Sequence, residues 1–184
     1  MRKLSQINER LFGSGVARAS SDERRLENRI GGNIKELIPI DTGEDFLWAD
    51  EDLIIDGQEY FTHEEILEIG DKIASYGWRF PNSMDIFGIS IEYMGEMRKR
   101  EQVTFSSYDA KVSAHDIICT SPHNGEEVSF ITTTATTSIA YFLDTGTSKR
   151  YNGWFVTVQR QSVNFGMGAI KEEAKCRIRL IKDK

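Results

Sequence analysis

Apolar and polar residues alternate through most of the second half of the chain. From Val103 onward this period of two recurs in segments rich in Val, Ile, Thr, Tyr and Phe: VTFSSYDAKVSA, EEVSFITTTATTSIAYFLD, NGWFVTVQRQSVNFGMG and AKCRIRLIK. Clusters of turn-forming residues separate them at 124–125, 144–146 and 152–153. Alternation of this kind is typical of strands with one buried face, so this half is predicted to be antiparallel β structure.

Shorter extended elements are predicted before that half. The stretch KELIPI is expected to be extended, because Pro39 disfavours helical geometry at the preceding residue. A strand is predicted from Phe46 to Ala49, and Asp56 and Gly57 form a turn signal.

A first helix is predicted between Thr62 and Gly77. Thr62 is followed three residues later by Glu65, which is the pattern of a capping box, and Gly77 is expected to end the helix. Its apolar face is predicted to consist of Ile66, Ile69 and Ile73, with Leu67 on the flank.

A second helix is predicted after Pro81, capped by Asn82 or Ser83, with Asp85 in its first turn. Its apolar face is expected at Met84, Phe87 and Ile91, which recur at spacings of three and four. Because the two helices precede the strands and do not alternate with them, the predicted class is α+β.

The N-terminal segment has a different character. Residues 5–28 are polar and helix-prone, their apolar residues are too sparse to bury a full face, and the sequence IGGN at 30–33 marks a boundary. We therefore predict an extended or helical N-terminal arm at 1–35 and one domain at 36–184. Composition alone leaves two interpretations of the arm open: a frayed terminus, or a segment that orders on a partner.

Charge is unevenly distributed along the chain. Residues 1–35 carry eight Lys or Arg against four Asp or Glu, whereas residues 36–71 carry thirteen acidic residues and no Lys or Arg. With a net charge of −6, the surface as a whole is not suited to nucleic acid. The acidic residues are interpreted as helix-start charges and a solvated face, with a metal site as the alternative.

Evidence for catalytic chemistry is lacking in the sequence. No phosphate-binding glycine motif, nucleophile elbow or metal-ligand spacing of the three histidines occurs, and no apolar run is long enough to span a membrane. Cys119 and Cys176 lie in β-like apolar contexts and are expected to be reduced, although a disulfide between them is possible. We predict no enzyme activity, no cofactor, and neither nucleic acid nor membrane as a partner.

Polar and aromatic residues of the β half define a possible ligand surface. Threonine-rich strands can face a partner or a glycan, and exposed aromatic rings can stack on one, but β propensity and core packing explain the same residues. The candidate surface consists of Thr134, Thr136, Tyr141, Tyr151 and Trp154.

One stretch, YGWRFPNSMDI at 76–86, gathers aromatic residues, one arginine and a proline before a polar cap. It could be an active site, a ligand platform or a packing corner. It also belongs to an ordered series of motifs: LWADEDL, GQEYFTHEEI, GWRFP, TTTATTSIAYFL and GWFVTV…RQSVNFG…AKCRIRLIKD.

This series resembles the Fibrobacter-succinogenes-type major paralogous domain, over about residues 46–184. The resemblance implies a C-type-lectin-like fold and makes the stretch a packing corner. Trp78 would then enter the core, Arg79 would pair with the acidic residues of 36–71, and a residue after Pro81 would cap the second helix. The matched structural positions are Trp48, Trp78, Arg79, Pro81 and Cys176.

The sequence departs from that family in ways that affect function. The family's Cys-Pro before the Gly-Trp is missing, so Cys176, which matches its closing cysteine, has no partner. The calcium-binding triplets of sugar-binding C-type lectins are absent, so calcium-dependent glycan binding is not implied. The cysteine constellation of the related formylglycine-generating enzymes has no counterpart, and an enzyme of that type would depend on Cys119 and Cys176.

The arm sequence KLSQINERLFGSGVARASSDERRLEN resembles the opening segment of many proteins of tailed phages that infect gut bacteria. We therefore expect a non-catalytic virion structural protein, made in the bacterial cytoplasm and associated with the capsid or tail, such as a head fibre, decoration protein or tail adaptor. Other virion proteins would be its partners, and a homo-oligomer is expected. The arm residues expected to dock are Arg10, Leu11, Arg18, Arg24, Arg25 and Arg29. The alternatives are a calcium-independent module for a host receptor or surface glycan and the formylglycine-generating type of enzyme.

Overall fold

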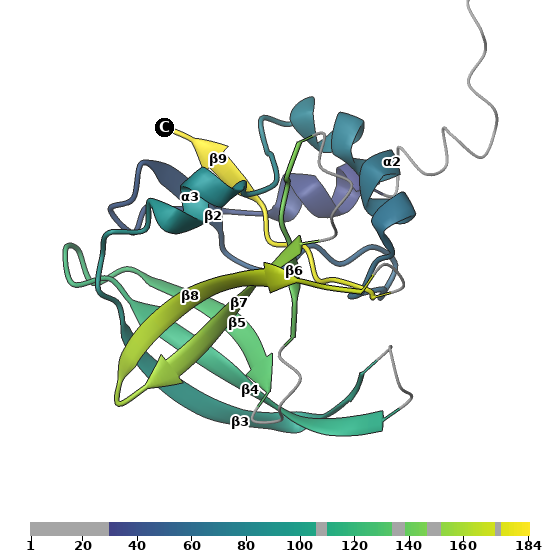
Figure 1. Cartoon of the computed structure of the whole chain (residues 1–184). Coiled ribbons are helices and arrows are strands. Elements are labelled where there is room, and N and C mark those ends of the chain that lie inside the picture. Colours follow the sequence, from purple (N-terminus) through teal and green to yellow (C-terminus); the bar gives the residue numbers. More distant parts are fainter. Residues whose placement is uncertain (1–29, 106–109, 134–138, 147–151, 172–173) are drawn as a thin grey trace, which may run out of the picture.

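The computed structural model describes residues 30–105, 110–133, 139–146, 152–171 and 174–184. In these residues the chain is an α+β protein, as the sequence predicts, with a helical layer and a small sheet above a larger curled antiparallel sheet (Figure 1). No helix in this part of the chain is long and apolar enough to cross a membrane.

The upper layer begins with helical residues 30–36 and contains a three-stranded antiparallel sheet in the order β1-β2-β9. Its strands are β1 (Pro39–Ile40), β2 (Phe46–Ala49) and β9 (Ile181–Asp183). Ile40 lies opposite Trp48, and Leu47 lies opposite Lys182. The strand predicted at residues 46–49 is confirmed, and its neighbours come from both ends of the domain.

Helix α2 (His63–Ala74) has the predicted capping box. The Thr62 hydroxyl accepts from the Glu65 N–H, and the Glu65 carboxylate accepts from the Thr62 N–H at 2.7 Å. Gly77, with φ of +75°, lies just beyond the C-cap and turns the chain away from the helix axis. The predicted apolar face is confirmed, since Ile66, Ile69 and Ile73 are all buried.

Helix α3 (Ser83–Phe87) has the predicted Asn82 cap, but its predicted apolar face is wrong. Met84 and Phe87 are 76% and 77% exposed, and Ile86 is the buried residue. The helix ends after five residues at Gly88, so the three-and-four spacing toward Ile91 never becomes a helical face.

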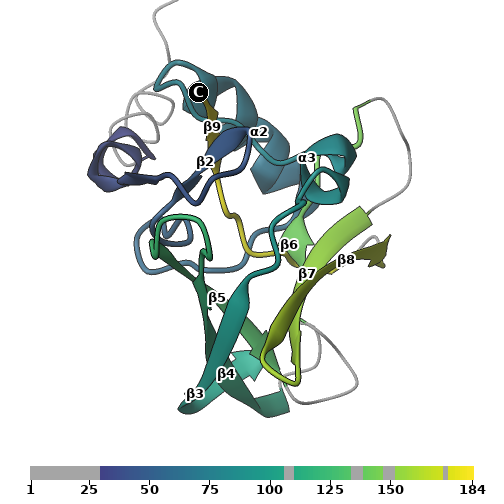
Figure 2. The same cartoon turned by 90° about the vertical axis from the view of Figure 1, so that its left-hand side faces the viewer.

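The larger sheet contains six strands in the order β5-β4-β3-β8-β7-β6, and all of its paired strands are antiparallel. They are β3 (Met94–Phe105), β4 (Ala110–Thr120), β5 (Glu127–Thr133), β6 (Tyr141–Phe142), β7 (Asn152–Gln159) and β8 (Ser162–Ala169). Strands β3 and β8 pair only at Met94 and Ser162, and beyond that point the sheet opens into two curved halves (Figure 2).

The turn predicted at residues 152–153 is wrong. Asn152 and Gly153 lie in β7, opposite Ala169 and Gly168. A side chain at Gly153 would bring a Cβ within 3.1 Å of Ala140 Cβ, so this glycine allows close strand approach. The actual reversal between β7 and β8 occurs at residues 160–161, whose φ values of 52° and 74° are unusual for residues other than glycine.

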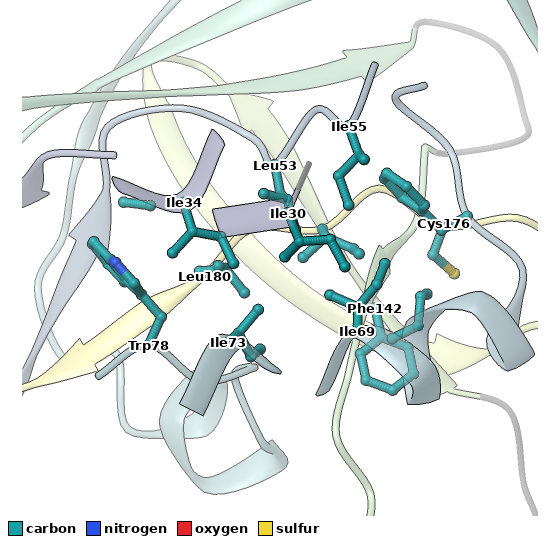
Figure 3. Packing of buried hydrophobic residues seen from close by; sticks show 14 of the residues in the cluster. Ile30, Ile34, Leu53, Ile55, Ile69, Ile73, Trp78, Phe142, Cys176 and Leu180 are labelled. Carbon is teal, nitrogen blue, oxygen red and sulfur yellow. The ribbon is translucent and has the colours of Figure 1, made fainter. Parts of the chain in front are cut away.

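The two larger hydrophobic cores lie on opposite sides of residues 176–181, and a small third cluster consists of Ala114, Ile131 and Ile139. The first core packs helical residues 30–36 and α2 against Leu53, Ile178 and Leu180 (Figure 3). The second core lies inside the curl of the large sheet and is rich in aromatic rings, including Trp48, Phe130 and Trp154.

Packing in the first core corrects the boundary predicted at residue 35. Ile30 and Ile34 are buried beside Ile73 and Trp78, so the helical residues 30–36 belong to the domain (Figure 3). The two glycines of IGGN favour a boundary in the sequence. Gly31 instead lies close to the Tyr76 ring, where a Cβ would come within 2.3 Å of the hydroxyl oxygen.

Ile34→Ala should lower the free energy of unfolding by about 2–5 kcal/mol, because it removes a buried side chain from a packed core. Glu36→Ala, on the exposed side of the same helical segment, should change it by less than about 0.5 kcal/mol. Urea unfolding followed by tryptophan fluorescence measures both variants. Equal stabilities would place Ile34 outside the core.

Candidate functional site

Two neighbouring grooves open beside the 76–86 corner. The larger, which we call the α3 groove, has a volume of 640 Å³ and lies between the start of α3 and the ends of β7 and β8. The smaller, which we call the α2 groove, has a volume of 260 Å³ and lies between α2 and β6. Both are lined by Asp144, so they are adjacent.

Exposed apolar side chains lie at both grooves. Met84 lines the α3 groove, and Leu67, which is 59% exposed on the outer side of α2, lines the α2 groove. Phe87, on α3, is a third large apolar side chain that is exposed. Large apolar side chains gathered at a concave surface are a usual mark of a binding site for a partner.

The corner between the grooves is built from local and distant contacts. Trp78 enters the first core, as predicted for a packing corner. The chain then pairs with β9, where Arg79 and Ile181 exchange backbone hydrogen bonds of 2.9 Å. The Pro81 carbonyl accepts a hydrogen bond from the Asp144 N–H, which brings residues 143–146 beside α3.

Arg79 does not pair with the acidic residues of 36–71, so that prediction is wrong. It donates to Asp85 at 2.6 Å and forms an ion pair with Asp183 at 2.8 Å. Burial raises the pKa of the Asp85 carboxyl, but the hydrogen bonds from Arg79 and the Asn82 N–H lower it by more, and the net pKa lies below its usual value. The arginine meets these two carboxylates because β9 and α3 flank the corner.

A buried ionic cluster lies between the two cores. Arg177 donates from Nε to Asp52 Oδ2 at 2.5 Å and from Nη1 to Glu59 at 2.6 Å. Arg179 donates from Nε to Asp52 Oδ1 at 2.7 Å and from its two Nη groups to the carbonyls of Ala49 and Ser129. Asp52 and both arginines are almost completely buried.

Sequence reasoning missed this cluster. The sequence predicts that the acidic residues of 36–71 are helix-start charges and a solvated face, whereas Asp52 is buried between two arginines. The available signal was CRIRLI, in which two arginines alternate with apolar residues on a short extended segment. Such alternation normally means that one face meets solvent, and here that face meets a carboxylate in the interior.

The ionic cluster is suited to structure and not to chemistry. Burial lowers the pKa of Arg177, but Asp52, Tyr141 and Glu59 raise it by more, so its guanidinium stays charged. The 170 Å³ cavity beside it is also lined by Glu51 and Asp116, and the Nε and Nη1 groups of both arginines already have acceptors.

A second group of buried polar residues fixes the loop before β2. Tyr93 donates from its hydroxyl to Thr42 at 2.6 Å, and Ser121 donates to the Thr42 carbonyl at 2.7 Å. Glu44 is buried beside them, and burial raises the pKa of its carboxyl. These contacts join residues 41–45 to the turn between β4 and β5 and line no groove described above.

The two cysteines are free and lie in different cores, Cys176 in the first and Cys119 in the second. Burial raises the pKa of each thiol to about 12, so the nucleophilic thiolate is scarce at neutral pH. Among the described residues, no group of three or more His, Cys, Asp and Glu side chains is arranged to hold a metal ion.

Two members of the candidate ligand surface are core residues, which corrects that prediction. Tyr141 and Trp154 are fully buried and stack with ring centroids 4.4 Å apart. Trp154 donates from Nε1 to the Phe142 carbonyl, and the Tyr141 hydroxyl accepts from the Ile131 N–H. Their strand positions face the inside of the curled sheet, so neither ring can stack on a ligand.

Other predicted site residues fall outside the described part of the chain. These are Thr134, Thr136 and Tyr151 of the candidate ligand surface and Arg10, Leu11, Arg18, Arg24, Arg25 and Arg29 of the arm. The remaining structural positions are described: Trp48, Trp78, Pro81 and Cys176 are all buried.

Comparisons of this chain with models of protein families, with curated proteins and with solved structures find no match.

Asp52→Asn should destabilise the protein by about 3–5 kcal/mol, because it removes the charge that neutralises two buried guanidinium groups. Glu68→Gln, which also neutralises one carboxylate but lies at an exposed position of α2 outside this cavity, is the control and should have a small effect. Thermal unfolding of the two variants beside wild type measures the difference. Similar losses for both substitutions would contradict the structural role of the cluster.

Both native thiols should resist a thiol reagent such as dithionitrobenzoate at pH 8, because burial hinders access and disfavours the thiolate. After unfolding in guanidinium chloride, two thiols per chain should react promptly. Absorbance at the wavelength of the released thiolate counts them. Rapid reaction of a thiol in the folded protein would instead support the enzyme alternative that depends on Cys119 and Cys176.

Proposed function

We propose that this chain is a non-catalytic structural protein of a bacteriophage virion, associated with the capsid or tail, that binds its neighbours through its arm and its grooves. The observation that carries the binding role is the exposure of Leu67 and Met84 at two adjacent grooves. Apolar surface of this kind gains free energy when a partner covers it.

The buried groups support a role without catalysis. Several buried titratable side chains have structural partners: Asp52 pairs with Arg177 and Arg179, and the two thiols are packed in the cores. A catalytic nucleophile needs access to substrate and a neighbouring base, and neither thiol has access.

The virion assignment depends on the arm, whose sequence resembles the opening segment of tailed-phage proteins. With this assignment we also propose that the protein is made and assembled in the bacterial cytoplasm. For the domain we propose a C-type-lectin-like fold. Its support is the ordered series of motifs, together with the pairing of β2 with β9, which joins strands from the beginning and the end of the domain.

A calcium-independent site for a host receptor or glycan is the second candidate, and the α3 groove favours it. At 640 Å³ this groove falls within the range of about 300–1,000 Å³ that is usual for small-ligand sites. Polar groups of Asn82, Ser83, Asp144 and Asn152 line it. A glycan screen without a hit, while the protein is found in particles, would leave only the structural role.

The virion role is tested by removing residues 2–28, which keeps Ile30 and Ile34 in place. The full-length protein should be found by mass spectrometry in gradient-purified particles from the culture that makes it, and the shortened protein should stay in the unassembled fraction. Glu36→Ala, an exposed substitution inside the domain, should enter particles normally. Full-length protein absent from particles, or equal incorporation of the shortened protein, would overturn the proposal.

A further inference from the structure

The α2 groove has an apolar floor and a negatively charged rim. Leu67, Phe80 and Phe142 provide apolar surface, and the exposed carboxylates of Asp71 and Asp144 lie among the same lining residues. Arg79 is the cation among these residues, and it already pairs with Asp85 and Asp183. The groove is therefore matched to an apolar side chain flanked by basic ones.

The size of the groove indicates a peptide segment. Its 260 Å³ lies below the roughly 300–1,000 Å³ that is usual for small-molecule sites. It suits one or two apolar side chains of a peptide, while the flanking basic residues stay near water at the rim. Such a site would cover Leu67, which is otherwise 59% exposed.

A segment of this chain has the matching chemistry. Residues 1–29 contain seven Lys or Arg and four Asp or Glu, a difference of +3, and they place Arg10 directly before Leu11 and Phe12. The domain, in contrast, carries an excess of acidic residues, thirteen of them at 36–71 with no Lys or Arg. Opposite charges on two parts of one chain favour their association.

The connection between the arm and the domain also favours docking in the same molecule. Ile30, the first described residue, packs in the first core with Ile69 and Ile73 of α2, so the arm joins the domain beside the helix that forms one wall of the groove (Figure 3). The 18 residues at 12–29 can span about 60 Å when extended. A tether of this length keeps the arm at a high effective concentration near its own groove.

We propose that residues 1–29 dock intramolecularly in the α2 groove, with Leu11 and Phe12 against Leu67, Phe80 and Phe142 and with arm arginines beside Asp71 and Asp144. The domain thereby holds its own arm until a partner with a better matched surface displaces it. This contact concerns the isolated protein and does not require that the protein enter a virion.

Spin labelling of the full-length protein tests the proposal. A nitroxide attached at Ser14→Cys reports on the arm alone, since both native thiols are buried. The spectrum of the wild-type background should contain a large immobilised component that does not change on dilution. Leu67→Glu should lower the docking equilibrium constant at least about tenfold, the effect expected when an apolar anchor is lost.

Charge variants make the test specific. Asp71→Lys should release the arm, and Arg10→Glu combined with Asp71→Lys should restore part of the immobilised component. The matched control is Glu126→Lys, the same charge change in the turn between β4 and β5, and its spectrum should equal that of the wild-type background. Circular dichroism confirms that each variant is folded.

Three outcomes would overturn the proposal. The label could be mobile in the wild-type background, equally immobilised in Leu67→Glu and Asp71→Lys, or immobilised only at high protein concentration. The last outcome would assign the contact to two copies of the chain. The spectra are recorded on purified protein, so a mobile arm would contradict the docking proposal but not the virion role. Absence of the protein from particles would contradict the virion role but not the docking.

Discussion

The pairing of Asp52 with Arg177 and Arg179 is the constraint on which the two-core structure depends. Residues 176–181 run between the cores: Ile178 and Leu180 enter the first, and Ile181 enters the second. The arginines between them can be buried only because a carboxylate meets both. A shift of one residue would place guanidinium groups in the first core, so the ion pairs also fix the register of this segment.

Local signals in the sequence predicted much of the fold. The Thr62 and Asn82 caps and the strand at 46–49 depend on residues within a few positions of one another, and the structure confirms each of them. Contacts between distant residues were not predictable in this way. Arg79 donates a hydrogen bond to Asp183, which lies 104 residues further along the chain, and no residue near Arg79 in the sequence indicates this partner.

The candidate site shows the same limit. Periodicity predicts that a residue lies on one face of an element, but the neighbouring element decides whether that face is buried. Tyr141 and Trp154 are buried because the sheet curls around them, and Met84 is exposed because α3 ends after one turn. Neither the curl nor the end of α3 follows from the spacing of apolar residues. The sequence therefore singles out the stretch at 76–86 but does not predict the grooves beside it.

Because residues 176–181 lie between the two cores, their late position in the chain determines when the domain can finish folding during synthesis. Residues 30–74 leave the ribosome early, but the side chains that complete their core, Cys176, Ile178 and Leu180, emerge last in this domain. Until then the isoleucine side chains of α2 stay partly exposed, so they can bind chaperones or promote aggregation. The domain consequently completes its folding only after residue 181 has emerged, and closing so long a loop makes that step slow.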